Sequence, residues 1–528
     1  MEEAPNTYSQ HQKPSYTGFI LIFVLIKIGL NLLAISKFGF QRDELLNFSL
    51  ADHMDWGFVE VPPVIALLAK VSTVIFGDSL FAARLFPTLC SGLIVWLGGL
   101  TAIELGGKKF AVVLTCLALI FSPAFAASGY LFEPVVFDQL WWVLSVWLII
   151  KYCNTKAVKY IYYWGIVIGV GLLTKYTMAF FTIALLLGIL AGSQRKLFLN
   201  RHIVAAAGLA FIIFLPNLIW QIHHNFPVFN QMATLKKEQL DQLKPSGFVL
   251  QQLVDNGMGI FIWLPGFLFL LISPIWRKFQ FIAFTFILTF AFFIAMNGKH
   301  YYLFGAYPML FAAGGAVFEK WLDNRKVTFK IAVAAICTVP NFFIFPIALP
   351  ILSLNQTIGF VQAGQKKFPF LNFVVLWDDN HVHPITQNYG DMLGWDELTA
   401  KVARAWQDLT PMQRQHTQIY ADNYGEASAL NHYGKQYHLP AVISLDSSFD
   451  LWAPANLDGD YIIYVDEQKG GNVKKLRPEL AGCIKVGCIE NPLAIENGTA
   501  IFLLVHPKQS LNQLYKKDLA DKRIHRLI

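Results

Sequence analysis

Residues 18–36, GFILIFVLIKIGLNLLAIS, determine the class of this protein. Lys27 is the one charged residue of the stretch, and about 20 predominantly apolar residues cross the ~30 Å hydrocarbon core of a bilayer as a helix. A cleaved signal peptide would have a shorter apolar region of about 7–15 residues and a small-residue cleavage site, and neither is found here. We therefore predict a retained first transmembrane helix.

The same apolar character recurs through the first 350 residues. Of the 528 residues, 55% are hydrophobic and 15% are charged, whereas a soluble domain has about 25% charged residues. The sequence predicts an α-helical polytopic membrane protein with about 11 transmembrane helices. The predicted spans are residues 18–36, 81–104, 110–127, 133–151, 160–174, 177–192, 202–221, 257–275, 279–296, 301–318 and 328–352.

Basic residues in the loops predict the orientation of the chain. With the N-terminal stretch and its Lys13 in the cytoplasm, the short inside loops carry 14 Lys and Arg residues, and the longer outside loops carry 8. Cytoplasmic loops carry the excess of Lys and Arg, so we predict a plasma (inner) membrane protein whose C-terminal part is extracytoplasmic. The loops account for the net charge of +7. No basic stripe with interleaved aromatics is present, so no nucleic-acid partner is expected.

The composition changes after residue 350, where charge rises and the long apolar runs end. We predict a transmembrane domain at residues 1–352 and a small periplasmic α/β domain at residues 353–528. Cys483 and Cys488 lie in this second part, where an oxidising compartment would allow either a small disulfide or two free thiols. The expected strands are residues 418–421, 441–445, 461–465 and 500–505, and the expected helices include 395–407 and 426–436.

Two predicted outside loops, residues 37–80 and 222–256, are longer than the others, and long ordered loops usually carry function. The first is predicted to hold two amphipathic helices on the membrane surface, one beginning near Arg42 and one at residues 64–76. The second, with its several lysines, resembles a flexible lid.

The adjacent carboxylates Asp43 and Glu44 stand just beyond the first span. Adjacent helix positions point about 100° apart, so the two side chains cannot share one task. One could take a proton while the other binds or orients, because desolvation at a membrane surface can raise a carboxylate pKa to a useful range. The alternative is a solvated acidic start to an amphipathic helix.

Several motifs follow in a recognisable order. They are Arg42-Asp43-Glu44, Asp55-Trp56-Gly57, Glu60-Val61-Pro62-Pro63, Arg84-Leu85-Phe86-Pro87, Leu173-Thr174-Lys175-Tyr176, Lys299-His300-Tyr301-Tyr302, Asn423-Tyr424-Gly425-Glu426-Ala427 and Asn431-His432-Tyr433-Gly434. This series, which covers nearly the whole chain, resembles the protein O-mannosyltransferase and lipid A aminoarabinose transferase superfamily.

The resemblance implies a C-type membrane glycosyltransferase. Such enzymes move a sugar from a polyprenyl-phosphate carrier to an envelope acceptor outside the cytoplasm: lipid A or lipopolysaccharide, another glycolipid, or a protein. Asp43 matches the catalytic base of the family, and Glu44 is expected to support it. A single base with a phosphate leaving group favours inverting displacement, because retention would need a second placed carboxylate.

A leaving phosphate at headgroup depth needs cations and hydrogen-bond donors. The predicted topology puts six candidates at that level: Arg84, Lys175, Lys299, His300, Tyr301 and Tyr302. The alternative is that the basic residues extend to the interface and that the tyrosines form an aromatic belt.

The candidates for sugar or acceptor binding are Glu60, Glu133 and Asp138, the last more than one turn inside a predicted span. A structural hydrogen bond to a neighbouring helix is the alternative for Asp138. The aminoarabinose transferases have a lysine where this chain has Val61, which argues against that substrate.

The sequence supports no particular cofactor, and a divalent metal stays an open alternative without supporting residues. The cysteines and histidines do not resemble a zinc site, and the pairs His223-His224 and His381-Val382-His383 lack surrounding carboxylates that would indicate a metal.

Two other classes of protein remain possible. A transporter or flippase would need charges along a central path and usually internal repeats, whereas here the acidic residues gather near the outer face. A non-catalytic envelope scaffold would tolerate replacement of Asp43.

Overall fold

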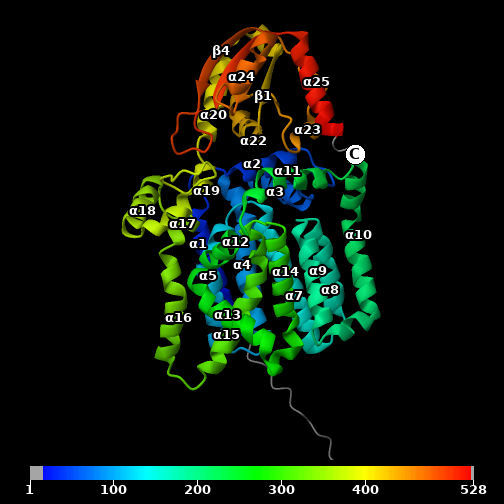
Figure 1. Cartoon of the computed structure of the whole chain (residues 1–528), viewed down its shortest axis with the longest axis vertical. Coiled ribbons are helices and arrows are strands. Elements are labelled where there is room, and N and C mark those ends of the chain that lie inside the picture. The colour runs from blue at the N-terminus through cyan, green and yellow to red at the C-terminus, as the bar shows by residue number, and fades with distance from the viewer. Residues whose placement is uncertain (1–15, 525–528) are drawn as a thin grey trace, which may run out of the picture.

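The computed structural model describes residues 16–524, so the predicted cytoplasmic Lys13 lies outside the described residues. Three parts follow one another along the long axis of the molecule (Figure 1). A bundle of roughly parallel and antiparallel helices forms one end, short helices lie across its upper surface, and a domain with a β-sheet forms the other end.

The apolar helices of the bundle coincide with the predicted spans, since each span overlaps one of them. Six helical stretches within residues 16–524 are long and apolar enough to cross a membrane, which supports a multi-pass membrane protein. The number of spans stays a prediction. The bundle helices are α1 (Thr17–Ala34), α4 (Leu80–Glu104), α5 (Lys109–Phe121), α7 (Pro134–Thr155), α8 (Lys159–Leu172), α9 (Thr177–Ala191), α10 (Arg201–His223), α13 (Ile260–Ile272), α14 (Phe281–Ala295), α15 (Tyr307–Trp321) and α16 (Val327–Phe342).

Polar contacts show that loops predicted to share a side of the membrane lie together. At the end remote from the sheet, Lys151 near the C-terminal end of α7 pairs with Glu104 of α4 at 3.0 Å, and Lys278 donates to Asn154 at 2.9 Å. At the opposite end, the turn between α8 and α9 contacts the first loop, where the backbone N–H of Val64 donates to the carbonyl of Leu173. Which end faces the cytoplasm stays a prediction.

The first long loop forms α2 (Arg42–Asp52) and α3 (Val64–Phe76), and the second forms α11 (Pro227–Glu238) and α12 (Pro245–Asn256). Helices α2, α3 and α11 lie across the end of the bundle (Figure 1). A capping box starts α2, because Gln41 accepts from the N–H of Asp43, and Glu44 accepts from the N–H of Gln41. Such caps satisfy backbone donors that have no partner within the helix.

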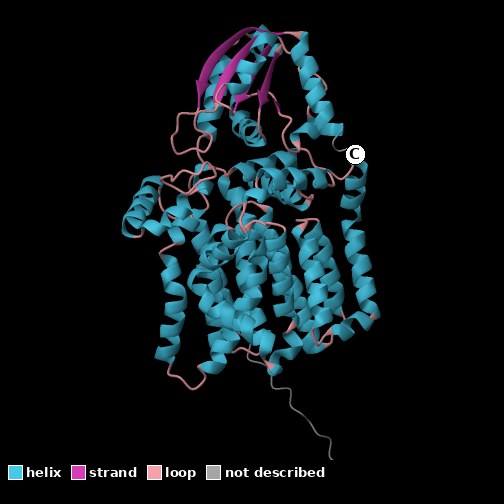
Figure 2. Cartoon of the chain, in the orientation of Figure 1, coloured by secondary structure: helices cyan, strands magenta, loops and turns pink. Residues whose placement is uncertain are grey.

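The C-terminal domain is a mixed five-stranded sheet with helices (Figure 2). Its order is β2-β1-β3-β5-β4, in which β1 runs parallel to β2 and β3, and β5 runs antiparallel to β3 and β4. The strands are β1 (Thr417–Ala421), β2 (Val442–Ile443), β3 (Tyr461–Asp466), β4 (Leu480–Cys488) and β5 (Ala500–Pro507), and the longer helices are α20 (Trp395–Gln407), α22 (Tyr424–Tyr433) and α25 (Gln509–Ile524). Helix α18 (Leu354–Lys367) lies apart from the sheet, at the level of the short helices above the bundle (Figure 1).

Strand β4 was not predicted, because its glycines, cysteines and Lys485 leave no β-branched run. This strand determines whether two cysteines can form a disulfide. Cys483 and Cys488 both lie on it, as free thiols. Residues five apart in an extended strand are separated by about 16 Å, too far for a disulfide. The disulfide alternative is therefore excluded in this fold.

The sheet domain rests on α2 through α22. The ring of His432 packs against Phe40 at 4.5 Å and Phe48 at 6.4 Å between centroids. Both oxygens of the Glu60 carboxylate accept hydrogen bonds from Ser448, one from its N–H and one from its hydroxyl. The first loop thus joins the bundle to the sheet domain.

Candidate active site

A cavity of about 910 Å³ lies where the bundle, the first loop and the sheet domain meet. Its walls come from the start of α2, the segment before α7, the 3₁₀ helix η5 (His300–Ala306) after α14, and the chain between α17 (Phe345–Ala348) and α20. Five of the predicted site residues line it: Asp43, Glu133, Lys299, His300 and Tyr301.

Asp43 lies in the first turn of α2 and faces the cavity. Its carboxylate is half-buried, and Oδ1 accepts a hydrogen bond of 2.8 Å from the hydroxyl of Tyr424 at the start of α22. Sequence reasoning noted Tyr424 only as part of a motif, because a hydrogen bond across 381 residues of chain leaves no local pattern.

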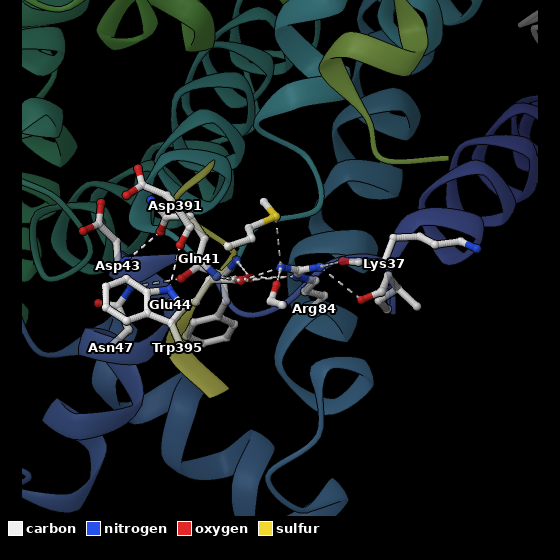
Figure 3. A network of polar contacts seen from close by, with 12 residues as sticks. Lys37, Gln41, Asp43, Glu44, Asn47, Arg84, Asp391 and Trp395 are labelled. Carbon is white, nitrogen blue, oxygen red and sulfur yellow. Dashed lines mark hydrogen bonds and ion pairs between the residues drawn. The ribbon is translucent and has the colours of Figure 1, made fainter. Parts of the chain in front are cut away.

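Glu44 points away from the cavity and toward Arg84 (Figure 3). Both side chains are fully buried, and Arg84 Nη2 lies 2.7 Å from Glu44 Oε2. The rest of the guanidinium donates to Glu44 Oε1 and to the carbonyls of Ile35, Lys37 and Gly39. Arg84 was predicted to hold a phosphate, but its donors are occupied by the protein and it does not line the cavity.

Glu44 also accepts hydrogen bonds from two backbone N–H groups, those of Gln41 and Phe132, at 2.9 Å each. It therefore ties the start of α2 to α4 and to the segment before α7. The adjacent carboxylates thus point to different surroundings: Asp43 faces the cavity, and Glu44 anchors the helix that carries it.

A cationic wall faces the same cavity. Lys299, His300 and Tyr301 line it, and Lys175 lies over the rings of Tyr301 and Tyr302 at 5.2 and 5.1 Å. Neither lysine has a carboxylate within 4 Å among the side chains that the structure describes. Burial lowers the pKa of Lys175, and the more distant Asp138 and Glu133 oppose that shift. A partly buried cation without an ion-pair partner is costly, so an anionic ligand would be favoured here.

His300 is held from α12, which sequence reasoning did not connect with the site. Its Nδ1 lies 2.6 Å from Oδ2 of Asp255, and its carbonyl accepts from the side-chain amide of Gln252 at 3.0 Å. Asp255 lines the cavity as well. A single aspartate in a long loop carries no signal in the sequence, so only the fold could identify it.

Glu133 is the N-cap residue of α7, and its half-buried side chain lines the cavity. Asp138 does not, because its two oxygens accept from Trp142 Nε1 at 3.0 Å and from the Thr177 hydroxyl at 2.6 Å. The structural alternative for Asp138 thus fits the geometry. Glu60 is likewise away from the cavity, since Ser448 occupies its carboxylate.

Two further residues of the cavity, Arg42 and Asp391, form an ion pair that the sequence did not predict. Arg42 Nη2 lies 2.7 Å from Asp391 Oδ1, and 3.6 Å from Oε1 of Glu496. Burial raises the pKa of Asp391 to about 6, and the nearby Arg42 guanidinium opposes this shift. The pair joins the first turn of α2 to the segment that precedes α20.

His383 and Asp379 line the cavity, with His383 Nε2 at 2.9 Å from Asp379 Oδ2, and His381 contacts the Asp379 carbonyl. Within the described part of the chain no three His, Cys, Asp or Glu side chains are grouped so that they could hold a metal ion. The histidines therefore act as partners of Asp379 in this structure.

Comparisons with known proteins agree with this arrangement. Residues 60–220 match the family model for dolichyl-phosphate-mannose-protein mannosyltransferases. No curated protein matches the chain significantly.

Two solved structures of ArnT from Cupriavidus metallidurans share the fold. The apo structure is 14% identical, with a TM-score of 0.61 over 92% of this chain and 98% of that chain. The structure bound to undecaprenyl phosphate is 15% identical, with a TM-score of 0.60 over 93% and 98%. The predicted fold class is confirmed, because the chain shares the fold of these ArnT structures, with many apolar helices and a small C-terminal sheet domain.

Proposed function

We propose that this protein transfers a sugar from a polyprenyl-phosphate carrier to an acceptor hydroxyl, with Asp43 as the general base. One observation carries the proposal: the half-buried carboxylate of Asp43 lines one wall of the cavity and Lys299 lines another, with Lys175 over the rings of Tyr301 and Tyr302 beside it. Lipid-phosphate glycosyl transfer needs both, because a proton leaves the acceptor while negative charge grows on the phosphate.

The cationic wall supports a phosphate donor. Lys299 and His300 line the cavity, and Lys175 lies against the tyrosines behind it. Charge-assisted hydrogen bonds to phosphate are roughly twice as strong as neutral ones. The undecaprenyl phosphate bound to the ArnT relative supports a polyprenyl carrier.

In the proposed reaction, one carboxylate oxygen of Asp43 takes the acceptor proton as the acceptor oxygen attacks C1 of the sugar. The C1–O bond to phosphate breaks, and the released polyprenyl phosphate stays beside Lys299, Lys175 and His300. A base on one side of the sugar and cations at the leaving group favour direct displacement with inversion. Glu133 would bind a hydroxyl of the sugar or acceptor.

The acceptor class is open among lipid A or lipopolysaccharide, another glycolipid and a protein. Val61 stands where an aminoarabinose transferase has lysine, so we do not assign that sugar. Mass spectrometry of envelope glycolipids and glycoproteins from a strain lacking the protein should identify both the sugar and the acceptor.

The donor can be tested with purified protein. We expect polyprenyl phosphate to be released when lipid-linked sugar and an envelope extract are supplied together, and release to cease in Asp43→Asn. Efficient transfer from a soluble nucleotide sugar alone would overturn the proposal.

We further propose that the cavity opens outside the cytoplasm. Single cysteines at the exposed positions Lys236 and Asp458 should react with a membrane-impermeant reagent in intact cells. Cysteines at the exposed positions Lys156 and Arg195 should react only after lysis. If a cysteine at position 156 reacted in intact cells, the orientation would be the opposite of the one proposed.

A further inference from the structure

Residues of the sheet domain contact the turn of α2 that carries Asp43. The Tyr424 hydroxyl donates to Asp43 Oδ1 at 2.8 Å. Beside it, the aliphatic stem of Arg42 packs so closely on Gly425 that a methyl group there would lie 2.7 Å from Arg42 Cγ. The guanidinium of Arg42 then pairs with Asp391, at 2.7 Å. Two segments of the chain beyond the bundle, the start of α22 and the segment before α20, thus hold this turn.

We propose that Tyr424 is a positioning residue for the catalytic carboxylate, so that the sheet domain completes the active site of the membrane domain. The proposal rests on the proposed function, in which Asp43 is the base. Tyr424 touches the base rather than the substrate, and its role is to fix the base and stabilise its charged form.

The position of Tyr424 is itself well determined. Asn423 caps α22 by accepting from the N–H of Glu426, and the N–H of Tyr424 donates to Asp446 Oδ2 at 3.0 Å. Burial raises the pKa of Tyr424 well above its ordinary value, so the hydroxyl remains a donor at any working pH. A rigid helix start therefore presents a permanent donor to Asp43.

One oxygen of Asp43 remains for chemistry. Tyr424 occupies Oδ1, and none of the groups that the structure describes donates a hydrogen bond to Oδ2. A carboxylate anchored through one oxygen keeps the other at a defined place, and a misplacement of about 1 Å can cost about 100-fold in rate. The other ionisable groups that act on Asp43 are Glu133, Lys175, Tyr301 and Asp391.

The test is Tyr424→Phe in the full-length purified enzyme, assayed for release of polyprenyl phosphate from lipid-linked sugar. We expect kcat to fall about 10- to 100-fold with the donor KM within about threefold. The acid limb of the pH–rate profile should move to higher pH, because the carboxylate loses a donor that stabilises its charged form. A purely structural role would not move that limb.

Tyr515→Phe is the matched control. It removes a hydroxyl that donates to the Pro454 carbonyl within the same domain, far from the cavity lining. It should leave kcat and the acid limb unchanged. If Tyr424→Phe accumulates poorly, fluorotyrosines at position 424 keep the ring and hydroxyl while making the hydroxyl more acidic. They should move the acid limb in the opposite direction to Tyr424→Phe.

The outcomes separate the two proposals. An unchanged acid limb in Tyr424→Phe, with or without a fall in kcat, overturns the positioning role while leaving the proposed function intact. Full turnover in Asp43→Asn would instead remove the proposed function, and the positioning role with it.

Discussion

Two groups of charges flank the first turn of α2, and the fold uses them differently. Glu44 and Arg84 are fully buried, and their bonds are made to each other and to the backbone. Asp43, Lys175 and Lys299 have no ion-pair partner within 4 Å among the described residues, and Asp43 and Lys299 face the cavity. A charge whose hydrogen bonds are complete stabilises the protein, whereas one left open at a cavity is available to a ligand.

The strongest test of this contrast is Asp43→Asn. A positioned general base contributes about 10²–10⁴-fold in rate, so turnover should fall by that order while donor binding and the amount of folded protein are unchanged. Turnover and donor binding should be measured separately in detergent. Normal turnover at normal protein levels would show that Asp43 is not the base.

Breaking the buried pair of Glu44 and Arg84 should instead lower the stability of the protein. Arg84→Met leaves the Glu44 carboxylate buried without its cation, which costs about 3–5 kcal/mol, and Glu44→Gln should destabilise in the same direction. The sequence alone predicted that Glu44 supports Asp43, because no local pattern identifies Arg84 as its partner. Thermal unfolding of the detergent-solubilised protein measures this loss.

The control is Lys435→Met, which breaks an exposed ion pair with Asp78 at 3.2 Å. Exposed pairs contribute at most about 1 kcal/mol, so its unfolding temperature should be close to that of the unmodified protein. If Arg84→Met and Lys435→Met lowered the unfolding temperature equally, the buried pair would contribute no more to stability than the exposed pair.

Removing a cation that faces the cavity should weaken use of the lipid-linked donor rather than destabilise the fold. Lys299→Ala deletes a charge-assisted contact worth about 1.5–3 kcal/mol, equivalent to about 10- to 150-fold in kcat/KM. Unfolding should change little, and replacement of the exposed Lys237 should change neither quantity. Donor titrations would show whether the loss lies in KM.

The smallest expected effect is a pH dependence of donor affinity. Burial lowers the pKa of Lys175, and its protonated form is the one that binds phosphate. The donor KM should therefore rise, as pH increases, at a lower pH than an ordinary lysine would produce. Lys175→Arg should flatten this limb because a guanidinium stays charged. If the donor KM rose with pH in the same way in Lys175→Arg and in the unmodified protein, a group other than Lys175 would be responsible for the pH dependence.

Local patterns were sufficient to predict much of the fold. Helix α3 (Val64–Phe76) and α20 (Trp395–Gln407) have the predicted bounds, because apolar periodicity and capping signals lie within the segment itself. Strand β4 was missed because its stability comes from pairing with β5 rather than from a β-branched run. Asp43, Glu133 and Lys299 were predicted as site residues from motif and depth, and they do line the cavity.

The sequence by itself determined a polytopic helical membrane protein, a sheet domain at its end, and Asp43 with its neighbours as the region of interest. These follow from composition, periodicity and short motifs, which are local properties. Only the tertiary structure decided that Arg84 pairs with Glu44, that Asp255 holds His300, and that Tyr424 reaches Asp43 across 381 residues. The choice of partner for a charge depends on which segments the fold brings together, and no local pattern records it.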